Sequence, residues 1–185
     1  MQSNKVSGFT LVETIIGIVL IAIAFSIMST WIIPASERSA DTLHQIRAAE
    51  LAQSVLSEIS SKAFDENSDK HGGNIRCGES GITCTAEASL GADAGENNRS
   101  LFDDVDDYHG LDYDAGEIED SQGNVLSAYI GYEMTITVGN DSDYNGVTIS
   151  GGDAGDDTST AKLITVRIVL PTDAQFTFST YRVNF

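Results

Sequence analysis

A run of 25 residues near the start of the chain, Phe9 to Ile33, is apolar except for one carboxylate, that of Glu13. An α-helix of this length measures roughly 37 Å, which is enough to cross the ~30 Å hydrocarbon core of a bilayer with some tilt. A carboxylate at the bilayer centre costs about 2.5–3.5 kcal/mol on insertion scales, and less near an interface. The run therefore predicts a membrane-spanning helix in which Glu13 needs a compensating partner.

The eight residues before this run are polar and carry one cation, Lys5. In an ordinary secretory signal the apolar core precedes the small residues at the cleavage site. Here the small residue, Gly8, comes first, so cleavage after it would keep the helix and create a new amine on Phe9. An ammonium group beside Glu13 would offset the cost of the buried carboxylate. A plain single-span anchor explains the length of the run but neither Glu13 nor Gly8.

The sequence Gly8-Phe9-Thr10-Leu11-Val12-Glu13, followed by a long apolar helix, resembles the prepilin signature of type IV pilins and type II secretion pseudopilins. The resemblance implies that prepilin peptidase, a membrane aspartyl peptidase, cuts between Gly8 and Phe9 and methylates Phe9. It implies that Glu13 pairs with the N-terminal amine of a neighbouring pilin subunit during assembly. It also implies an inner-membrane protein of a Gram-negative bacterium with a periplasmic head, which later enters an extracellular pilus.

The pattern of the chain predicts a leader at 1–8, a hydrophobic helix at 9–33 and an amphipathic helix at 34–63. Pro34 is expected to end or kink the apolar run, and Trp31 suits either a membrane–water interface or a buried core. Apolar residues recur at steps of three or four in the second helix, which is typical of one buried face. They are Leu43, Ile46, Ala49, Ala52, Val55 or Leu56, Ile59 and Ala63.

The remaining residues, 64–185, predict an acidic globular head with loops at 64–124 and an antiparallel sheet at 125–185. The expected strands are Val125–Val138, Leu163–Leu170 and Gln175–Val183, with Val147–Ser150 as a candidate fourth. Packing of this sheet on the amphipathic helix gives an α+β head. The same layout is the type IV pilin fold that the resemblance implies.

Two features of the loop region suggest how it is held. Six residues separate Cys77 from Cys84, and export of the head predicts a disulfide between them. A zinc half-site with His71 is the alternative. The acidic run from 102 to 111 contains interleaved apolar residues, which predict that it packs rather than remaining solvated. These are Phe102, Val105, Tyr108 and Leu111.

The net charge of the chain is −18 and is concentrated in the head. Residues 64–185 hold 23 Asp and Glu against six Lys and Arg, which leaves a formal charge of −17. Such a surface repels polyphosphates, so nucleic acid is excluded as a partner, and it attracts divalent cations.

One stretch matches the first half of a calcium loop. Asp141, Asp143 and Asn145 offer oxygen ligands at alternate positions, Gly146 permits the sharp turn, and Asp153, Asp156 or Asp157 could complete the shell. The alternative is a polar turn between strands. A second candidate for Ca²⁺ is the set Asp103, Asp104, Asp106 and Asp107, whose mutual repulsion a cation would relieve.

The sequence shows no nucleophile elbow, phosphate loop or metalloprotease helix, and His109 is interpreted as a surface or packing residue, so we expect no enzyme.

Three stretches resemble minor pilins of the mannose-sensitive haemagglutinin (MSHA) pilus: 102–110, 143–146 and 178–185. The mid-chain cysteines depart from major pilins, in which a disulfide often closes a C-terminal loop. Three functions remain open: a minor pilin that supports assembly and adhesion, a secretion pseudopilin, and a tip adhesin or calcium-binding module with a surface receptor.

Overall fold

The structure is a computed structural model that describes Gly8, residues 10–70 and residues 75–185, with only the backbone for 31–40. Phe9, His71 and the side chain of Trp31 therefore lie outside the described residues. The chain divides into two compact units, Met1–Leu43 and His44–Phe185. Each unit is described separately below.

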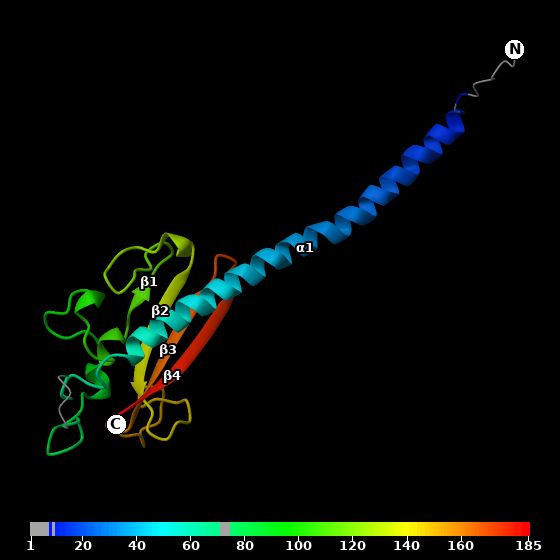
Figure 1. Cartoon of the computed structure of the whole chain (residues 1–185). Coiled ribbons are helices and arrows are strands. Elements are labelled where there is room, and N and C mark those ends of the chain that lie inside the picture. The colour runs from blue at the N-terminus through cyan, green and yellow to red at the C-terminus, as the bar shows by residue number, and fades with distance from the viewer. Residues whose placement is uncertain (1–7, 9, 71–74) are drawn as a thin grey trace, which may run out of the picture. The chain divides into compact units, whose positions relative to one another are not determined.

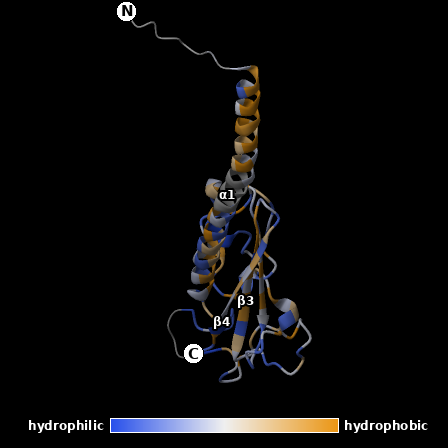
Figure 2. Cartoon of the chain, turned by 90° about the vertical axis from the view of Figure 1, so that its right-hand side faces the viewer, coloured by the Kyte–Doolittle hydropathy of each residue, from blue (hydrophilic) through white to orange (hydrophobic). Residues whose placement is uncertain are grey.

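Helix α1, Leu11–Ser60, runs through both units. Its first part, Leu11–Thr30, is long and apolar enough to cross a membrane and is coloured mostly as hydrophobic in Figure 2. None of its side chains is buried. Helix α1 continues past Pro34, which ends the apolar run without ending the helix. Proline fixes φ near the helical value, so it removes one hydrogen bond without barring helical backbone.

The head contains a four-stranded antiparallel sheet in the order β1-β2-β3-β4 (Figure 1). Its strands are β1 Asp112–Tyr113, β2 Glu133–Asn140, β3 Ala161–Val169 and β4 Gln175–Val183. Short 3₁₀ turns connect the loops: η1 Glu87–Ser89, η2 Arg99–Leu101, η3 Asp106–Tyr108 and η4 Ser127–Tyr129. The predicted α+β class, with an N-terminal helix and a C-terminal antiparallel sheet, is confirmed.

The head core forms where the last turns of α1 pack on one face of the sheet. Helix residues Ala48, Leu51, Ala52, Val55 and Ile59 are buried there. Alternate residues of β2 and β3 meet them, namely Met134, Ile136, Val138, Ile164, Val166 and Ile168. The predicted face of the helix is only partly right. Leu43, Ile46 and Ala49 are exposed, because they lie on the other side of the helix from the sheet.

Two strand predictions are wrong. The predicted strand at Val125–Val138 begins only at Glu133, after turn η4. Gly131 has φ of +85°, a left-handed conformation that strand residues do not adopt, so the chain turns before β2 starts. Val147–Ser150 forms turns instead of a strand, and the backbone N–H of Ser150 donates to Glu87 Oε1 at 3.1 Å.

The loop region is held by a disulfide and by the acidic run. Cys77 and Cys84 are bonded to each other and pack with Phe64 in a small second core. Residues Phe102, Val105 and Tyr108 are buried in the main core, and Leu111 packs against it. The apolar anchors of the acidic run therefore pack as the sequence predicts.

Candidate functional site

The N-terminal turn of α1 brings together two residues of the predicted processing and assembly site. Thr10 immediately precedes the helix, and its Oγ1 accepts a hydrogen bond from the backbone N–H of Glu13 at 3.3 Å. Thr10 is therefore the N-cap, in the Thr-x-x-Glu pattern of a capping box. Glu13 lies in the first turn, where the helix dipole favours an anion. Its side chain is exposed, as is Gly8.

The apolar part of α1 presents large side chains to its surroundings. Leu11, Ile18 and Phe25 are 77, 62 and 67 % exposed. An isolated soluble protein rarely exposes a continuous apolar surface of this kind, so the helix needs lipid or other helices around it.

Within the head, Glu58 on the last turn of α1 holds two loop residues. Arg99 binds it in a fork, with Nε at 3.0 Å from Oε1 and Nη2 at 2.7 Å from Oε2. The hydroxyl of Tyr108 donates to Oε1 at 2.9 Å. Arg99 is only 4 % exposed, and its Nη1 also donates to the carbonyl of Glu119 at 2.8 Å. This network ties η2 and η3 to the helix.

Beyond the end of α1, the core face of the sheet becomes polar. Lys162 follows the same alternation as Ile164 and Val166, so its side chain points to the core face of β3. It pairs across the sheet with Asn140 on β2 and Arg182 on β4. Because α1 ends at Ser60, loop residues and η3 cover this layer instead of the helix.

Lys162 is fully buried among oxygen atoms. Its Nζ donates to the carbonyl of Phe64 at 2.9 Å and to Asp65 Oδ2 at 3.0 Å, and it also contacts Asp106 Oδ1. The ammonium lies 4.5 Å from the centroid of the Phe64 ring. Asp65 is 0 % and Asp106 2 % exposed, so one cation and two carboxylates share a site without access to water.

The two carboxyl groups beside Lys162 differ in their pKa. Burial raises the pKa of Asp106 to about 6 despite the attraction of Lys162. Burial also acts to raise the pKa of Asp65, but Lys162 and the backbone N–H groups of Asn67 and Thr85 together hold it below its usual value. Asp106 therefore keeps a proton more readily than Asp65 does.

A second set of acids surrounds η3. Asp104 is fully buried, and burial together with the charges of Asp106 and Asp107 raises its pKa to about 8. Its Oδ1 accepts the backbone N–H of Asp106 at 2.7 Å, while Oδ2 has no hydrogen-bond partner among the described residues. Desolvation and the nearby Asp107 raise the pKa of Glu96 to about 7. Three of the four residues in the second predicted cation set, Asp104, Asp106 and Asp107, are buried, and burial raises the pKa of Asp104 and of Asp106.

The predicted calcium ligands lie in the connection between β2 and β3. Oxygen atoms of Asp141, Asp143 and Asp156 lie within 4.8 Å of one another. Asn145 Nδ2 donates to Asp143 Oδ2 at 3.0 Å and to Asp153 Oδ2 at 2.8 Å. The structure therefore brings Asp141, Asp143 and Asp156 together and connects Asp143 to Asp153 through the Asn145 amide. Asp141 also accepts bonds from Tyr181 and the Gly146 N–H, as the polar-turn alternative requires.

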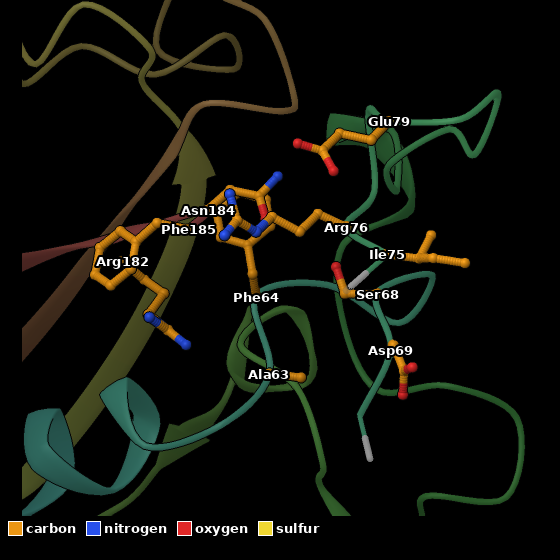
Figure 3. A pocket seen from close by; sticks show the side chains of 10 residues that line it. All are labelled: Ala63, Phe64, Ser68, Asp69, Ile75, Arg76, Glu79, Arg182, Asn184 and Phe185. Atoms are coloured by element: carbon orange, nitrogen blue, oxygen red, sulfur yellow. The ribbon is translucent and has the colours of Figure 1, made fainter. Parts of the chain in front are cut away.

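A pocket of about 370 Å³ has in its wall Arg76 and Glu79, which stand on either side of Cys77 in the sequence (Figure 3). Its walls come from the segment after α1, from the disulfide loop and from the end of β4. Two of the six head cations, Arg76 and Arg182, lie in it together with Asp69 and Glu79. The pocket is polar and of mixed charge, and no enzymatic constellation is found among its lining residues.

Comparison with known proteins identifies the N-terminal segment. Residues 3–29 match the family model described as the prokaryotic N-terminal methylation motif. The chain carries a prepilin-type N-terminal signal. No curated protein and no solved structure matches the chain. The prepilin signal indicates a type IV pilin-like or pseudopilin-like protein with a structural role, anchored through its apolar helix.

Three residues of this prepilin-type protein were not predicted from its sequence. Thr10 could have been found from the Thr-x-x-Glu spacing at the start of the helix. Lys162 could have been found because it lies two residues before Ile164 and four before Val166, on the same face of the strand. The predicted strand, Leu163–Leu170, began one residue too late to include it. Nothing in the local sequence marks Arg99, because its partner Glu58 is 41 residues away.

Proposed function

We propose that the protein is a minor pilin of a type IV pilus of the MSHA kind, most similar to the minor pilin MshD. The observation that carries the proposal is the methylation motif, in which Gly8 precedes an exposed apolar helix with Glu13 in its first turn. Prepilin peptidase cuts between Gly8 and Phe9, and the mature helix then enters the filament. In the filament, Glu13 pairs with the Phe9 amine of a neighbouring subunit.

The physical argument concerns the charge of Glu13. A carboxylate inside an apolar helix bundle is strongly disfavoured unless a cation lies beside it. Cleavage creates such a cation, the new N-terminal amine, on each processed subunit. Only a neighbour whose amine lies at the right axial position neutralises Glu13. The carboxylate then acts in assembly as a register device, and the exposed apolar surface of α1 supplies the packing.

Glu13→Gln and Glu13→Ala test the pairing. Both variants should be processed and inserted into the membrane, but their incorporation into filaments should fall several-fold. Glu117→Gln, the same replacement at an exposed site in the head, is the matched control and should incorporate normally. Immunoblots of sheared filaments and of membranes measure both quantities, and normal incorporation of the two Glu13 variants would contradict the pairing.

Replacement of Gly8 by valine tests the cleavage site. A Cβ at Gly8 meets no atom within 4 Å, so the change should leave the folded chain undisturbed and act only on peptidase recognition. Mass spectrometry should find uncleaved precursor, and a mature Phe9 terminus would refute the assignment.

Localisation separates the minor pilin from the pseudopilin alternative. A minor pilin should be recovered in filaments sheared from the cell exterior, where it supports assembly and adhesion. Recovery only from the periplasm and inner membrane, with protein secretion lost on deletion, would favour a type II secretion pseudopilin instead.

A further inference from the structure

Lys162 is held in a manner that an ordinary ion pair does not require. Its charge is removed from water, which costs several kcal/mol even after relaxation. Two buried carboxyl groups, rather than one, contact its amine, and the ring of Phe64 lies against it. A lysine amine in contact with one carboxyl group and hydrogen-bonded to a second has every group needed to form an amide.

The backbone fixes the two acids together and Lys162 separately from them. Ala63 pairs in parallel with Asp104, through Ala63 N–H to the Asp103 carbonyl at 3.2 Å and Val105 N–H to the Ala63 carbonyl at 3.0 Å. This pairing places Asp65 and Asp106 on adjacent segments above β3. Lys162 reaches them from the sheet, where residues on both neighbouring strands fix its register.

We propose that Lys162 and Asp106 form an intramolecular amide bond between Nζ and Cγ, with Asp65 as the proton carrier. The site thus holds a covalent cross-link between β3 and η3. This inference rests on the head alone and does not depend on the proposed function.

The reaction balances without any other reactant. Lys162 passes one proton to Asp106, which gives a neutral amine and a neutral carboxylic acid. The amine attacks Cγ, and Asp65 takes a second proton from the nitrogen and delivers it to the departing hydroxyl. One C–O bond breaks, one C–N bond forms, one water leaves and Asp65 is again ionised.

The surroundings favour each step. Contact between the reacting groups gives a high effective concentration. The raised pKa of Asp106 suits a carboxyl group that must be neutral, and the lowered pKa of Asp65 suits one that returns to its ionised form. The amide removes two opposite charges from a site without water, and the exclusion of water protects it from hydrolysis.

Intact-mass spectrometry of the purified full chain tests the proposal. Once the disulfide is counted, the mass should be lower than the sequence mass by about 18 Da, one water. Trypsin should fail to cut after Lys162, so that fragment 100–167 appears in place of 100–162 and 163–167. Further digestion after glutamate should leave peptides 100–117 and 134–167 joined to each other.

Three variants complete the test. Lys162→Arg keeps a cation but cannot form the amide, so it should have the full mass. Asp65→Asn keeps both reacting groups and removes the proton carrier, so the cross-linked fraction should fall at least tenfold. Lys70→Arg, at a lysine whose partners Glu66 and Asp103 are exposed, is the control and should keep the mass deficit.

The wild-type chain alone can overturn the proposal, whether or not a variant folds. A full sequence mass with free fragment 163–167 would show that Lys162 is only ion-paired. If the mass deficit were found in peptide 100–117 or peptide 134–167 while the two peptides were not joined, it would indicate a dehydrated aspartate. That result would equally refute the cross-link. Complete cross-linking of Asp65→Asn would refute the role given to Asp65.

Discussion

Arg99 is one of six Lys and Arg residues in the head, yet it is almost completely buried. Its guanidinium satisfies both oxygens of Glu58 and a backbone carbonyl, and burial does not prevent Glu58 from raising its pKa. Removal of a buried cation leaves its partner unpaired in a poorly hydrated site, which costs far more than the loss of a surface pair.

Arg99→Ala should therefore lower the free energy of unfolding by about 3 kcal/mol, the lower end for a broken buried pair, because Glu58 retains some contact with water. Urea unfolding of the full chain measures this quantity. Lys70→Ala is the matched control, since its carboxylate partners are about half exposed, and it should cost about 0–1 kcal/mol. Equal losses in the two variants would contradict the structural role of Arg99.

Asp104 should make stability depend on pH. Its pKa is raised from 3.8 to about 8, so the folded state binds a proton that the unfolded state releases. The stabilisation from this group is complete below about pH 4 and is lost as pH rises through about 8. Glu96, whose pKa is raised to about 7, acts in the same direction.

We expect the urea midpoint to decrease as the pH is raised from 5 to 9. In Asp104→Asn this decrease should be smaller, by the contribution of about one bound proton. Asparagine has the shape of the protonated acid, so the variant should fold. An unchanged pH dependence in Asp104→Asn would show that the group is ionised in the folded protein.

At the scale of elements, the sequence predicts what depends on local pattern. Residues Gln175–Val183 form β4 with the predicted bounds, because alternation and the turn at 171–173 specify both ends. The start of β2 was misplaced, because β-branched and aromatic residues before Gly131 imitate a strand while the glycine needs a left-handed backbone. The buried face of α1 was partly misassigned, because its apolar residues cover more than one side.

The candidate sites also differ in whether local sequence or distant contacts define them. Gly8 and Glu13 are found from a short contiguous motif, and the disulfide from two cysteines close in sequence. The Lys162 cluster joins residues up to 98 positions apart, and the burial of Asp104 depends on contacts just as distant in sequence. An acidic run is normally solvated, so only the folded arrangement shows which of its carboxylates face the core.

The connection between β2 and β3 carries the calcium prediction. We expect millimolar CaCl₂ to raise the melting temperature of the full chain by several degrees, because a cation would bridge Asp141, Asp143 and Asp156. Asp143→Asn, at an exposed position, should weaken the response. MgCl₂ at the same ionic strength controls for general screening, and identical shifts with both salts, or none with calcium, would refute a calcium site.

At the scale of the whole molecule, the formal charge of −18 sets the response to salt. Most of the head carboxylates lie on the surface and repel one another, which destabilises the compact state. An increase in ionic strength from about 0.01 M to about 0.15 M shortens the Debye length from about 30 Å to about 8 Å. The buried pair of Arg99 and Glu58 is screened much less.

We therefore expect NaCl in this range to raise the melting temperature, whereas the difference in unfolding free energy between wild type and Arg99→Ala should change little. KCl at the same ionic strength should produce the same shift if screening is the cause. A melting temperature that falls with salt would mean that exposed ion pairs, rather than repulsion, dominate the surface.

The anchoring of Glu58 also determines how the head would carry mechanical tension. A pull along α1 reaches the head through the turns that end at Ser60, where Glu58 is tied to Arg99 and Tyr108. The next residues, around Ala63, run parallel to 103–105, so their hydrogen bonds are loaded together in shear rather than opened one at a time. Unfolding of the loops would then require a force that the helix, η3 and the sheet carry jointly.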